Sequence, residues 1–370
     1  MPEFPYSRLR RWPDVEADNL QASDATDILL VERALALDVP GHEIAVIGDE
    51  YGAITLALTD AVRHGIRVHQ DLATGRRALA RNAEELGLGD FVSHELDAEL
   101  LAGARLVLLQ LPKALAELEE IADAVARWAA PDAVLVAGGR VKHMTLGQNE
   151  VLGRSFAHVQ AERAERKSRL VVASEPLPAP AQPPYPVTAE HDGLRLVAHG
   201  GAFAGARLDI GTRALLDVLR LEPTPGPADV IDLGCGTGAL AVSWALAHPD
   251  SRVIATDRSA AAVASARETV AANGVRDRVA VTHDDAGSEL PDASADVVLL
   301  NPPFHLGNSI HTGAATRLFE AAARILRPGG ELFTVFNSSL GYRAELTRIV
   351  GPTEQLHRTS KFTVTRSIRR

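Results

Sequence analysis

The sequence is poor in cysteine and has no long apolar run. Cys235 is the only cysteine among 370 residues, which excludes an internal disulfide and argues against a cysteine-based zinc site. No apolar run reaches the ~18 residues that a membrane-spanning helix needs. The start, Met1–Tyr6, lacks the basic-then-apolar layout of a signal peptide. We therefore expect a reduced, soluble, cytoplasmic protein without a membrane segment and without a metal.

Lysine is also scarce, and the net charge is negative. Only 4 of the 38 basic residues are lysine, and a bias in genome composition explains this at least as well as phosphate binding by arginine. The net charge is −10, and residues 1–186 hold 19 basic against 28 acidic residues. So acidic a chain excludes indiscriminate binding of nucleic acid. The local basic stretches 140–170 and 353–370 could still contact phosphates.

Length and composition predict two globular domains. A chain of 370 residues is about twice a typical domain, and 46% apolar residues exclude a wholly disordered chain. The segment 176–186 is rich in proline, which disfavours a helix or a central strand and is typical of a semi-rigid linker. We therefore predict domains at 1–175 and 187–370, joined by the linker 176–186.

The two halves share one pattern of apolar strands alternating with helical stretches. Gly48 and Gly234 each end an apolar run, and the pairs Gly48/Gly234, Gly52/Gly238 and Asp71/Asp257 are all separated by 186 residues. Strands alternating with helices of this length indicate parallel βαβ units. The sequence predicts an α/β protein of two tandem Rossmann-like domains, the first a degenerate copy of the second. Chance agreement of generic βαβ spacing is the alternative.

A glycine-rich loop follows the first apolar strand of the second half. In Gly234-Cys235-Gly236-Thr237-Gly238 the glycines permit a sharp turn and the close approach of a ligand to the backbone. Asp257, which ends the next strand, suits a ribose of either a dinucleotide or an adenosyl cofactor. Asp232 precedes the loop, where its carboxylate could reach an ammonium, and this favours S-adenosylmethionine. A purely structural glycine turn is the alternative.

Two acidic residues and a proline-rich tetrapeptide end the next two strands. Asp284 or Asp285 could accept a hydrogen bond from the adenine amine, with Asp285 favoured only by the family resemblance given below, or either could be a solvated turn acid. In Asn301-Pro302-Pro303-Phe304 the asparagine oxygen and the Pro302 carbonyl are uncharged acceptors for the two N–H groups of an exocyclic amine. Proline rigidifies the turn, and Phe304 offers a stacking face. This tetrapeptide predicts methylation of a planar amine.

The first half lacks these elements. Glu50 stands where the second half has Gly236, and Gln110 stands where it has Asn301. A bulky acidic side chain in the loop would block close approach of a ligand to the backbone and would repel a carboxylate. We therefore predict that the first domain binds no cofactor and serves substrate recognition or as a scaffold.

These motifs resemble the two-domain ribosomal RNA guanine-N2 methyltransferases, and the likeness spans nearly the whole chain. It extends to residues 137–140 in the first half and to 327–330 in the second. The resemblance implies a catalytically dead first domain and an active second domain that uses S-adenosylmethionine to make N2-methylguanosine. The residues expected at the cofactor are Phe203, Asp209, Thr212, Asp232, Gly234, Cys235, Gly236, Gly238, Asp257, Arg258, Asp284, Asp285 and Asn301.

The segment 140–170 resembles the 23S rRNA branch of the family more closely than the 16S rRNA branch. It implies a ribosomal RNA partner, either protein-free or at an early stage of assembly, and we expect a monomer. Asn301, Pro302, Pro303 and Phe304 are the expected catalytic group. Residues that could contact the RNA are His305, Asn337, Arg140, Lys142, Lys167, Arg169 and Lys361.

Three other functions remain open at this stage. A protein glutamine-N5 methyltransferase uses a similar Asn-Pro-Pro-aromatic tetrapeptide, although usually with tyrosine and a small helical front domain. Adenine-N6 methylation of DNA or RNA would use the same acceptor pair. A binding module or assembly factor that kept the fold without activity is the non-catalytic alternative.

Overall fold

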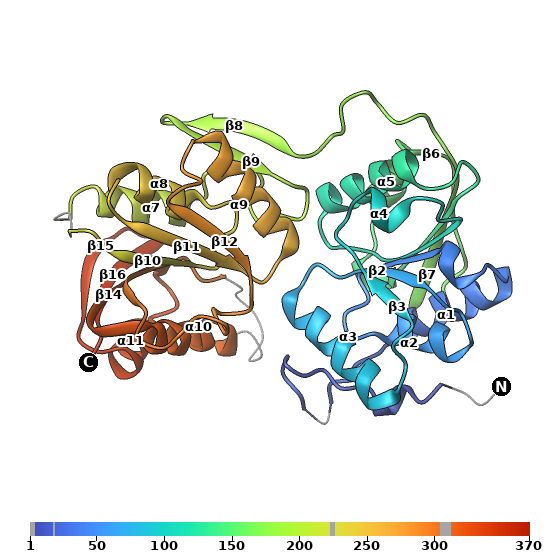
Figure 1. Cartoon of the computed structure of the whole chain (residues 1–370), viewed down its shortest axis with the longest axis horizontal. Coiled ribbons are helices and arrows are strands. Elements are labelled where there is room, and N and C mark those ends of the chain that lie inside the picture. The colour runs from blue at the N-terminus through green and yellow to red at the C-terminus, as the bar shows by residue number, and fades with distance from the viewer. Residues whose placement is uncertain (1–3, 18, 223–225, 304–311) are drawn as a thin grey trace. The chain divides into compact units, whose positions relative to one another are not determined.

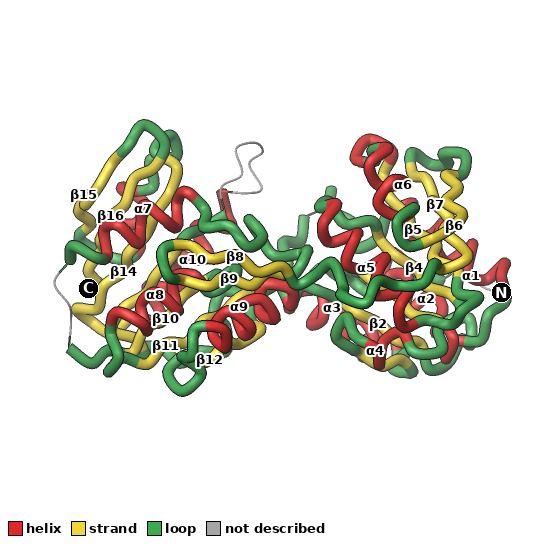
Figure 2. The backbone as a smooth tube through the Cα atoms, turned by 90° about the horizontal axis from the view of Figure 1, so that it is seen from above, coloured by secondary structure: helices red, strands yellow, loops and turns green. Residues whose placement is uncertain are grey.

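The computed structural model describes all residues except 1–3, 18, 223–225 and 304–311. The chain divides into two units, Met1–Tyr185 and Pro186–Arg370 (Figure 1). Residues 177–186 contain neither helix nor strand (Figure 2). Across the described residues, no helix combines the length and the apolar character needed to cross a bilayer.

The first unit is a seven-stranded sheet in the order β3-β2-β1-β4-β5-β7-β6, with helices on both faces. Strands β1 to β5 run parallel, and β7 is antiparallel to both β5 and β6. The elements are η1 (Tyr6–Arg8), α1 (Ala25–Leu37), η2 (Gly41–Glu43), β1 (Ile44–Ile47), α2 (Ala53–Asp60), β2 (Ile66–His69), α3 (Ala73–Leu86), β3 (Phe91–Ser93), α4 (Ala98–Leu101), β4 (Leu106–Gln110), α5 (Leu115–Trp128), β5 (Val134–Arg140), η3 (Val141–His143), α6 (Leu146–Leu152), β6 (Phe156–Ala161) and β7 (Ser168–Pro176).

The second unit repeats this sheet in the order β12-β11-β10-β13-β14-β16-β15, preceded by the hairpin β8-β9. The elements are β8 (Val187–His191), β9 (Leu194–Ala198), α7 (Ile210–Leu219), β10 (Asp229–Leu233), α8 (Ala239–Ala247), β11 (Arg252–Asp257), α9 (Ala260–Ala272), β12 (Val279–His283), β13 (Ala295–Leu300), α10 (Thr312–Ile325), β14 (Leu326–Asn337), α11 (Arg343–Ile349), β15 (Thr353–Arg358) and β16 (Phe362–Ile368).

The central strands are buried on both faces because their apolar residues alternate between two cores. Val230 packs with α7 and α8 residues such as Leu215 and Leu240, whereas Ile231 packs with α10 residues such as Phe319. A strand covered by helices on both sides is expected to be almost entirely apolar, as β1 and residues 106–109 of β4 are. β10 departs from this rule with the buried Asp232. The identical strand order of the two units confirms the prediction of two tandem Rossmann-like domains.

One of the three residue pairs predicted to match is displaced. The Gly48 N–H donates to the His69 carbonyl, as the Gly234 N–H donates to that of Thr256 (3.0 and 2.9 Å). The residue after His69 is Gln70, and its side chain accepts from the Leu72 N–H. Gln70, not Asp71, therefore occupies the place of Asp257, because the connection from the glycine loop to the next strand is one residue longer in the second unit.

Candidate active site

A pocket of about 350 Å³ lies at the carboxyl edge of the second sheet. In parallel sheets of this kind ligands bind at this edge, beside the point where the strand order reverses. Here that point lies between β10 and β13. Of the residues predicted from the sequence, this carboxyl-edge pocket brings together Phe203, Asp209, Thr212, Gly234, Cys235, Gly236, Asp257, Arg258, Asp284, Asp285, Asn301, Pro302 and Pro303.

Two of the loop glycines face the pocket and one does not. Gly234 (φ 78°) and Gly236 (φ 53°) have left-handed backbones, and a Cβ added to either would meet nothing within 4 Å. A Cβ on Gly238 would lie 3.2 Å from the Ala266 Cβ, so this glycine lets the start of α8 pack against α9. Gly234 and Gly236 thus leave an open cradle for a ligand, and Gly238 supports it from behind.

Asp257 ties the glycine loop to the end of β11. Its Oδ2 accepts from the Gly236 N–H and its Oδ1 from the Ser259 N–H, both at 2.9 Å. The side chain also lines the pocket next to Arg258. This arrangement suits the acceptance of hydrogen bonds from ribose hydroxyls.

Asp232 lies behind the loop rather than in the wall of the pocket. It is 1% exposed, and its Oδ2 accepts from the Ala241 N–H in the first turn of α8 (2.9 Å). Its Oδ1 is buried without a hydrogen-bond partner among the described residues. Burial raises the pKa of this carboxyl to about 7, and the nearby Asp257 adds to the rise. An orphaned acidic oxygen behind the glycine loop fits an ammonium of S-adenosylmethionine that is reached through a water, because the side chain itself does not line the pocket.

Asp232→Asn should change how stability depends on pH. Because the native pKa of about 7 lies above the usual 3.8, the native state holds a proton that the unfolded state has lost. The free energy of unfolding should therefore fall as the pH rises from 5 to 8, by at most about 3 kcal/mol. The asparagine does not titrate, so the variant should gain stability relative to the parent over this range. Chemical denaturation at several pH values measures the difference.

An exposed carboxyl provides the control for this measurement. Asp250→Asn changes an exposed acid and should leave the pH profile of the parent unaltered. Profiles that run parallel for the parent and Asp232→Asn would contradict a raised pKa at Asp232.

The two acids that follow β12 are both engaged within the protein. Asp284 accepts from the Ser288 hydroxyl (2.6 Å) and from the Glu289 N–H (2.9 Å). Asp285, which we preferred for the adenine amine, forms an ion pair with Arg317 of α10. Arg317 lines the pocket and was not identified from the sequence, since nothing in its local pattern marks it. Arg207, Thr237 and Thr256 also line the pocket and were likewise missed.

Asn301 is anchored to the first turn of α7. Its Nδ2 donates to the Thr212 hydroxyl (2.9 Å) and to Asp209 Oδ2 (3.2 Å). Its Oδ1 is buried and has no partner among the described residues. Pro302 is buried and Pro303 is exposed. The predicted Phe304 and His305 lie outside the described residues.

Phe203 lines the same pocket from the segment before α7. Its side chain is 67% exposed, which is unusual for phenylalanine. An exposed aromatic face at a pocket is suited to a planar ring.

The remaining predicted residues do not line the pocket. Asn337 ends β14, and its Oδ1 accepts from the backbone and hydroxyl of Ser339 (3.0 and 2.9 Å). Lys361 is exposed in the turn before β16. The other four belong to the first unit, at the junction of β5 and β7, where Gly139 pairs with Arg169. They are Arg140, Lys142, Lys167 and Arg169.

The corresponding edge of the first unit is built differently. A Cβ on Gly48 would lie 3.3 Å from the Gln110 Cβ, whereas the one on Gly234 would face open space. Asp49, the counterpart of Cys235, is fully buried and caps α2 by accepting from the Thr55 N–H (2.7 Å). Asp49 thus caps the first turn of α2 as Asp232 caps the first turn of α8. The two acids differ in their place in the chain, because Asp49 follows the first glycine of its loop and Asp232 precedes it.

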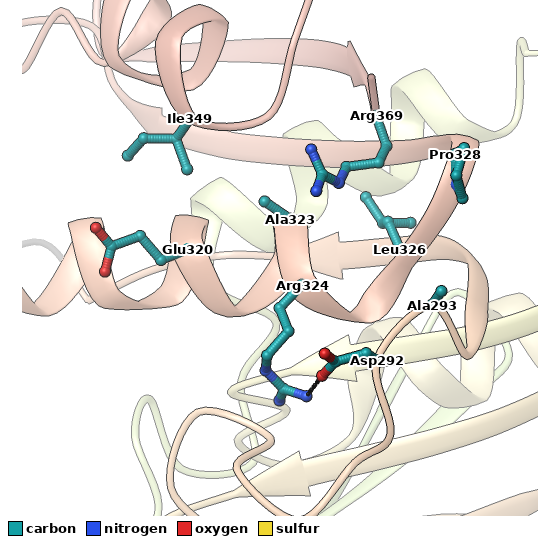
Figure 3. A pocket seen from close by; sticks show the side chains of 9 residues that line it. All are labelled: Asp292, Ala293, Glu320, Ala323, Arg324, Leu326, Pro328, Ile349 and Arg369. Carbon is teal, nitrogen blue, oxygen red and sulfur yellow. Dashed lines mark hydrogen bonds and ion pairs between the residues drawn. The ribbon is translucent and has the colours of Figure 1, made fainter.

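A second hollow of the second unit lies at the opposite, amino edge of its sheet. It has a volume of about 500 Å³ and lies where Ala293 precedes β13 and Arg369 follows β16. Figure 3 shows Arg324 of α10 reaching Asp292, with an N–O distance of 2.8 Å. Arg324 also donates to the Leu290 carbonyl, so it serves to fix the loop before β13. Neither in this hollow nor in the rest of the described residues does any group of three or more side chains suit a metal ion.

The fold and the carboxyl-edge pocket define an S-adenosylmethionine-dependent methyltransferase. Residues 193–366 match the family described as Methyltransferase small domain, and residues 3–177 match the RLMG N-terminal domain. The cofactor is S-adenosylmethionine, which confirms the prediction made from the glycine loop and the asparagine tetrapeptide.

Named relatives resemble the chain over its full length. The ribosomal RNA large subunit methyltransferase G of Streptomyces coelicolor is 35% identical and covers 98% of this chain and 97% of its own. That of Pseudomonas entomophila is 37% identical and covers 96% of each. The chain belongs to this family.

A solved structure shares the fold of both units. It is the T. thermophilus 16S rRNA N2 methyltransferase in complex with AdoMet and guanosine, with a TM-score of 0.74 and 23% identity over 94% of this chain and 92% of that one.

Proposed function

We propose that this enzyme methylates the exocyclic N2 amine of a guanine in 23S ribosomal RNA. The observation that carries the proposal is the buried Asn301 Oδ1, which has no partner among the described residues and belongs to a side chain that lines the carboxyl-edge pocket. The names of the relatives support the large ribosomal subunit as the source of the substrate.

The site would work by orientation rather than by strong base catalysis. Bound S-adenosylmethionine supplies a methyl group on a sulfonium. The guanine amine is a weak nucleophile because its lone pair is delocalised into the ring. Asn301 Oδ1 and the Pro302 carbonyl would accept its two N–H bonds and so direct the lone pair along the line of attack, and positioning of this kind supplies most of the rate gain. Both acceptors are uncharged, so neither competes for the methyl group.

The target base must leave its stack before it can reach Asn301. Phe304 would give it a new stacking partner, and flipping costs least where the base is already in a loop. His305 is a further candidate for contact with the base, whereas Asn337, which does not line the pocket and closes a turn with Ser339, is no longer proposed for this role. We infer that protein-free or early-assembly rRNA is the substrate, that the enzyme works as a monomer, and that it acts in the cytoplasm, where this RNA is found.

The first unit would hold the flanking RNA instead of a cofactor. Glu50 fills the place of Gly236 and Gln70 that of Asp257, so both the cradle and the ribose carboxylate are missing. Four basic residues, Arg140, Lys142, Lys167 and Arg169, form what we name the basic edge. They are brought together by β5 and β7, where the Val141 N–H donates to the Lys167 carbonyl (3.1 Å). Arg140 lies 3.8 Å from Asp24, whereas Lys142 and Lys167 are exposed.

Two basic residues near the C-terminus differ in their surroundings. Arg366 is held by Glu222 and Glu331 (3.2 and 3.5 Å) and by Glu354, so it stabilises the sheet edge. Lys361 is exposed and stays a candidate for phosphate contact.

Replacing Lys142 and Lys167 together by alanine should weaken the enzyme's use of RNA. We expect KM for rRNA to rise by about 10-fold and the slope of log KM against log salt to fall by about 1–2, because two phosphate contacts are lost. The maximal rate and the affinity for S-adenosylmethionine should not change. The test is to measure methyl transfer at salt concentrations between about 50 and 200 mM, because phosphate contacts weaken strongly over this range.

Two exposed arginines of the second unit provide the control. Arg220→Ala with Arg276→Ala removes the same amount of charge away from the pocket and should leave KM near the parent value. Equal losses in both double variants would mean that net charge, and not the basic edge, governs RNA binding.

The proposed activity itself is tested by transfer of labelled methyl groups. The enzyme is offered protein-free 23S and 16S rRNA, assembled subunits, transfer RNA, DNA and a release factor, and the product is digested to nucleosides. N2-methylguanosine in 23S rRNA is the expected product. The same nucleoside in 16S rRNA would place the enzyme in the other branch, and N6-methyladenosine or labelled glutamine would overturn the proposal. No transfer to any acceptor would favour a non-catalytic role.

A further inference from the structure

We propose that Thr212 and Asp209 are positioning residues that set the orientation of the Asn301 amide. Both were expected at the cofactor by resemblance. The structure points to a different task, namely to hold Asn301 so that its oxygen, and not its NH₂ group, is offered to the guanine amine. This inference rests on the proposed function of Asn301 as an acceptor.

The contacts use up the donors of the amide. A primary amide has two N–H bonds, and the described structure gives Asn301 Nδ2 two acceptors, Thr212 Oγ1 at 2.9 Å and Asp209 Oδ2 at 3.2 Å. The carboxylate decides which way the amide faces, because Oδ1 turned toward Asp209 would place two acceptors against each other. The NH₂ group and not the oxygen therefore contacts Asp209, and the amide oxygen is left buried without a partner among the described residues.

The orientation matters because an asparagine side chain is nearly symmetric in shape. Rotated by half a turn, it would present NH₂ to the NH₂ of guanine, and neither group could accept. The Asn-Pro-Pro sequence by itself does not choose between the two orientations. Asp209 makes the choice because its carboxylate only accepts, and the Thr212 hydroxyl accepts the second N–H bond.

The two positioning residues are themselves fixed. Asp209 is the N-cap of α7, and its Oδ2 accepts from the Gly211 N–H (2.9 Å) and the Thr212 N–H (3.2 Å) as well as from Asn301. A Cβ on Gly211 would lie only 3.0 Å from Asp209 Oδ2 and 3.4 Å from Asn301 Oδ1. The start of α7 and the end of β13 therefore meet closely, and a larger residue at Gly211 would press on Asp209 and on Phe362.

The first unit keeps the contact between strand and helix but not its chemistry. Gln110, which ends β4, donates to Asp27 in the first turn of α1, and Asp24 is the N-cap of that helix. The contact can therefore persist for structural reasons alone. What the second unit adds is a pair of acceptors for one NH₂ group and an amide oxygen that has no partner among the described residues. A test of the proposal must separate these two roles.

Thr212→Val removes the hydroxyl acceptor and keeps the shape of the side chain. We expect the single-turnover rate of methyl transfer to fall by about 10- to 100-fold, as small losses of alignment cost rates of this order. The dissociation constant for S-adenosylmethionine, measured by calorimetry, should stay within about 2-fold of the parent value. Thr212→Ser restores the hydroxyl and should recover most of the rate. The melting temperature of each variant reports whether the fold is intact.

The outcomes separate this inference from the proposed function. A fall in cofactor affinity that accounts for the whole loss of rate, or a serine variant as slow as the valine variant, would overturn the positioning role. Asn301→Ala is assayed in parallel. If it is inactive while Thr212→Val is fully active, only the positioning role fails. If Asn301→Ala is fully active, the acceptor role of Asn301 fails and the proposed function fails with it.

Discussion

Asn301→Ala is expected to slow methyl transfer by about 10²- to 10³-fold, the loss that follows removal of one preorganised hydrogen-bonding group at a reacting centre. The lost oxygen is the buried Oδ1, for which the described protein provides no partner, so its acceptor capacity is available to the substrate. The affinity for S-adenosylmethionine should change by less than about 3-fold, because the cradle of Gly234 and Gly236 is untouched. Single-turnover rates and calorimetry measure the two quantities.

Asn337 provides a matched comparison for this experiment. It ends the neighbouring strand β14, and its oxygen closes a turn to Ser339. Asn337→Ala should therefore retain most of the rate. A comparable loss in both variants would assign Asn337 a role at the substrate. Loss of cofactor affinity in step with the rate would mean that Asn301 supports the pocket instead of holding the base.

Gly236→Glu is expected to weaken binding of S-adenosylmethionine by more than about 100-fold. Gly236 has a φ of 53°, and a Cβ there would project into open space at the pocket. A glutamate would fill the cradle and would bring into the pocket a negative charge that repels a cofactor carrying a carboxylate. A left-handed backbone at a residue other than glycine also costs about 1 kcal/mol. Calorimetric titration with S-adenosylmethionine tests the expectation.

Two further variants isolate the cause of this loss. Gly274→Glu places the same residue at a glycine with a similar φ of 68° and equally open surroundings that does not line the pocket, so it should reproduce the strain without the loss of binding. Glu50→Gly should not create a cofactor site in the first unit, because Gln70 stands in place of Asp257 and Gln110 lies against Gly48. Stoichiometric binding of two cofactors by Glu50→Gly would contradict this reasoning.

Much of the fold follows from local pattern. The apolar runs that become β1 and β10, the glycines that end them and the helical stretches between them predict parallel βαβ units in both halves, and the observed strand orders agree. The match of Asp71 to Asp257 is wrong by one residue, because an equal separation along the chain conceals an insertion. Only the hydrogen bonds of His69 and Thr256 to the glycine loops reveal the correct partner, Gln70.

The wall of the pocket could be predicted only in part. Residues on the glycine loop and at strand ends carry recognisable local signals, and the structure brings most of them to one pocket. Arg317 has no such signal, because its contact with Asp285 joins residues 32 positions apart. Asp232 does have a signal, but the sequence could not reveal that it lies behind the loop and caps α8.

The sequence alone determined the class of fold, the half of the chain with an intact cofactor loop, and the asparagine that we propose as the acceptor for the substrate amine, because each depends on residues that are neighbours along the chain. Only the tertiary structure decided how that asparagine faces, since its NH₂ group is held by Thr212 and Asp209, 89 and 92 positions away. The direction of a side chain depends on the partners that folding brings to it, and those partners come from distant parts of the chain.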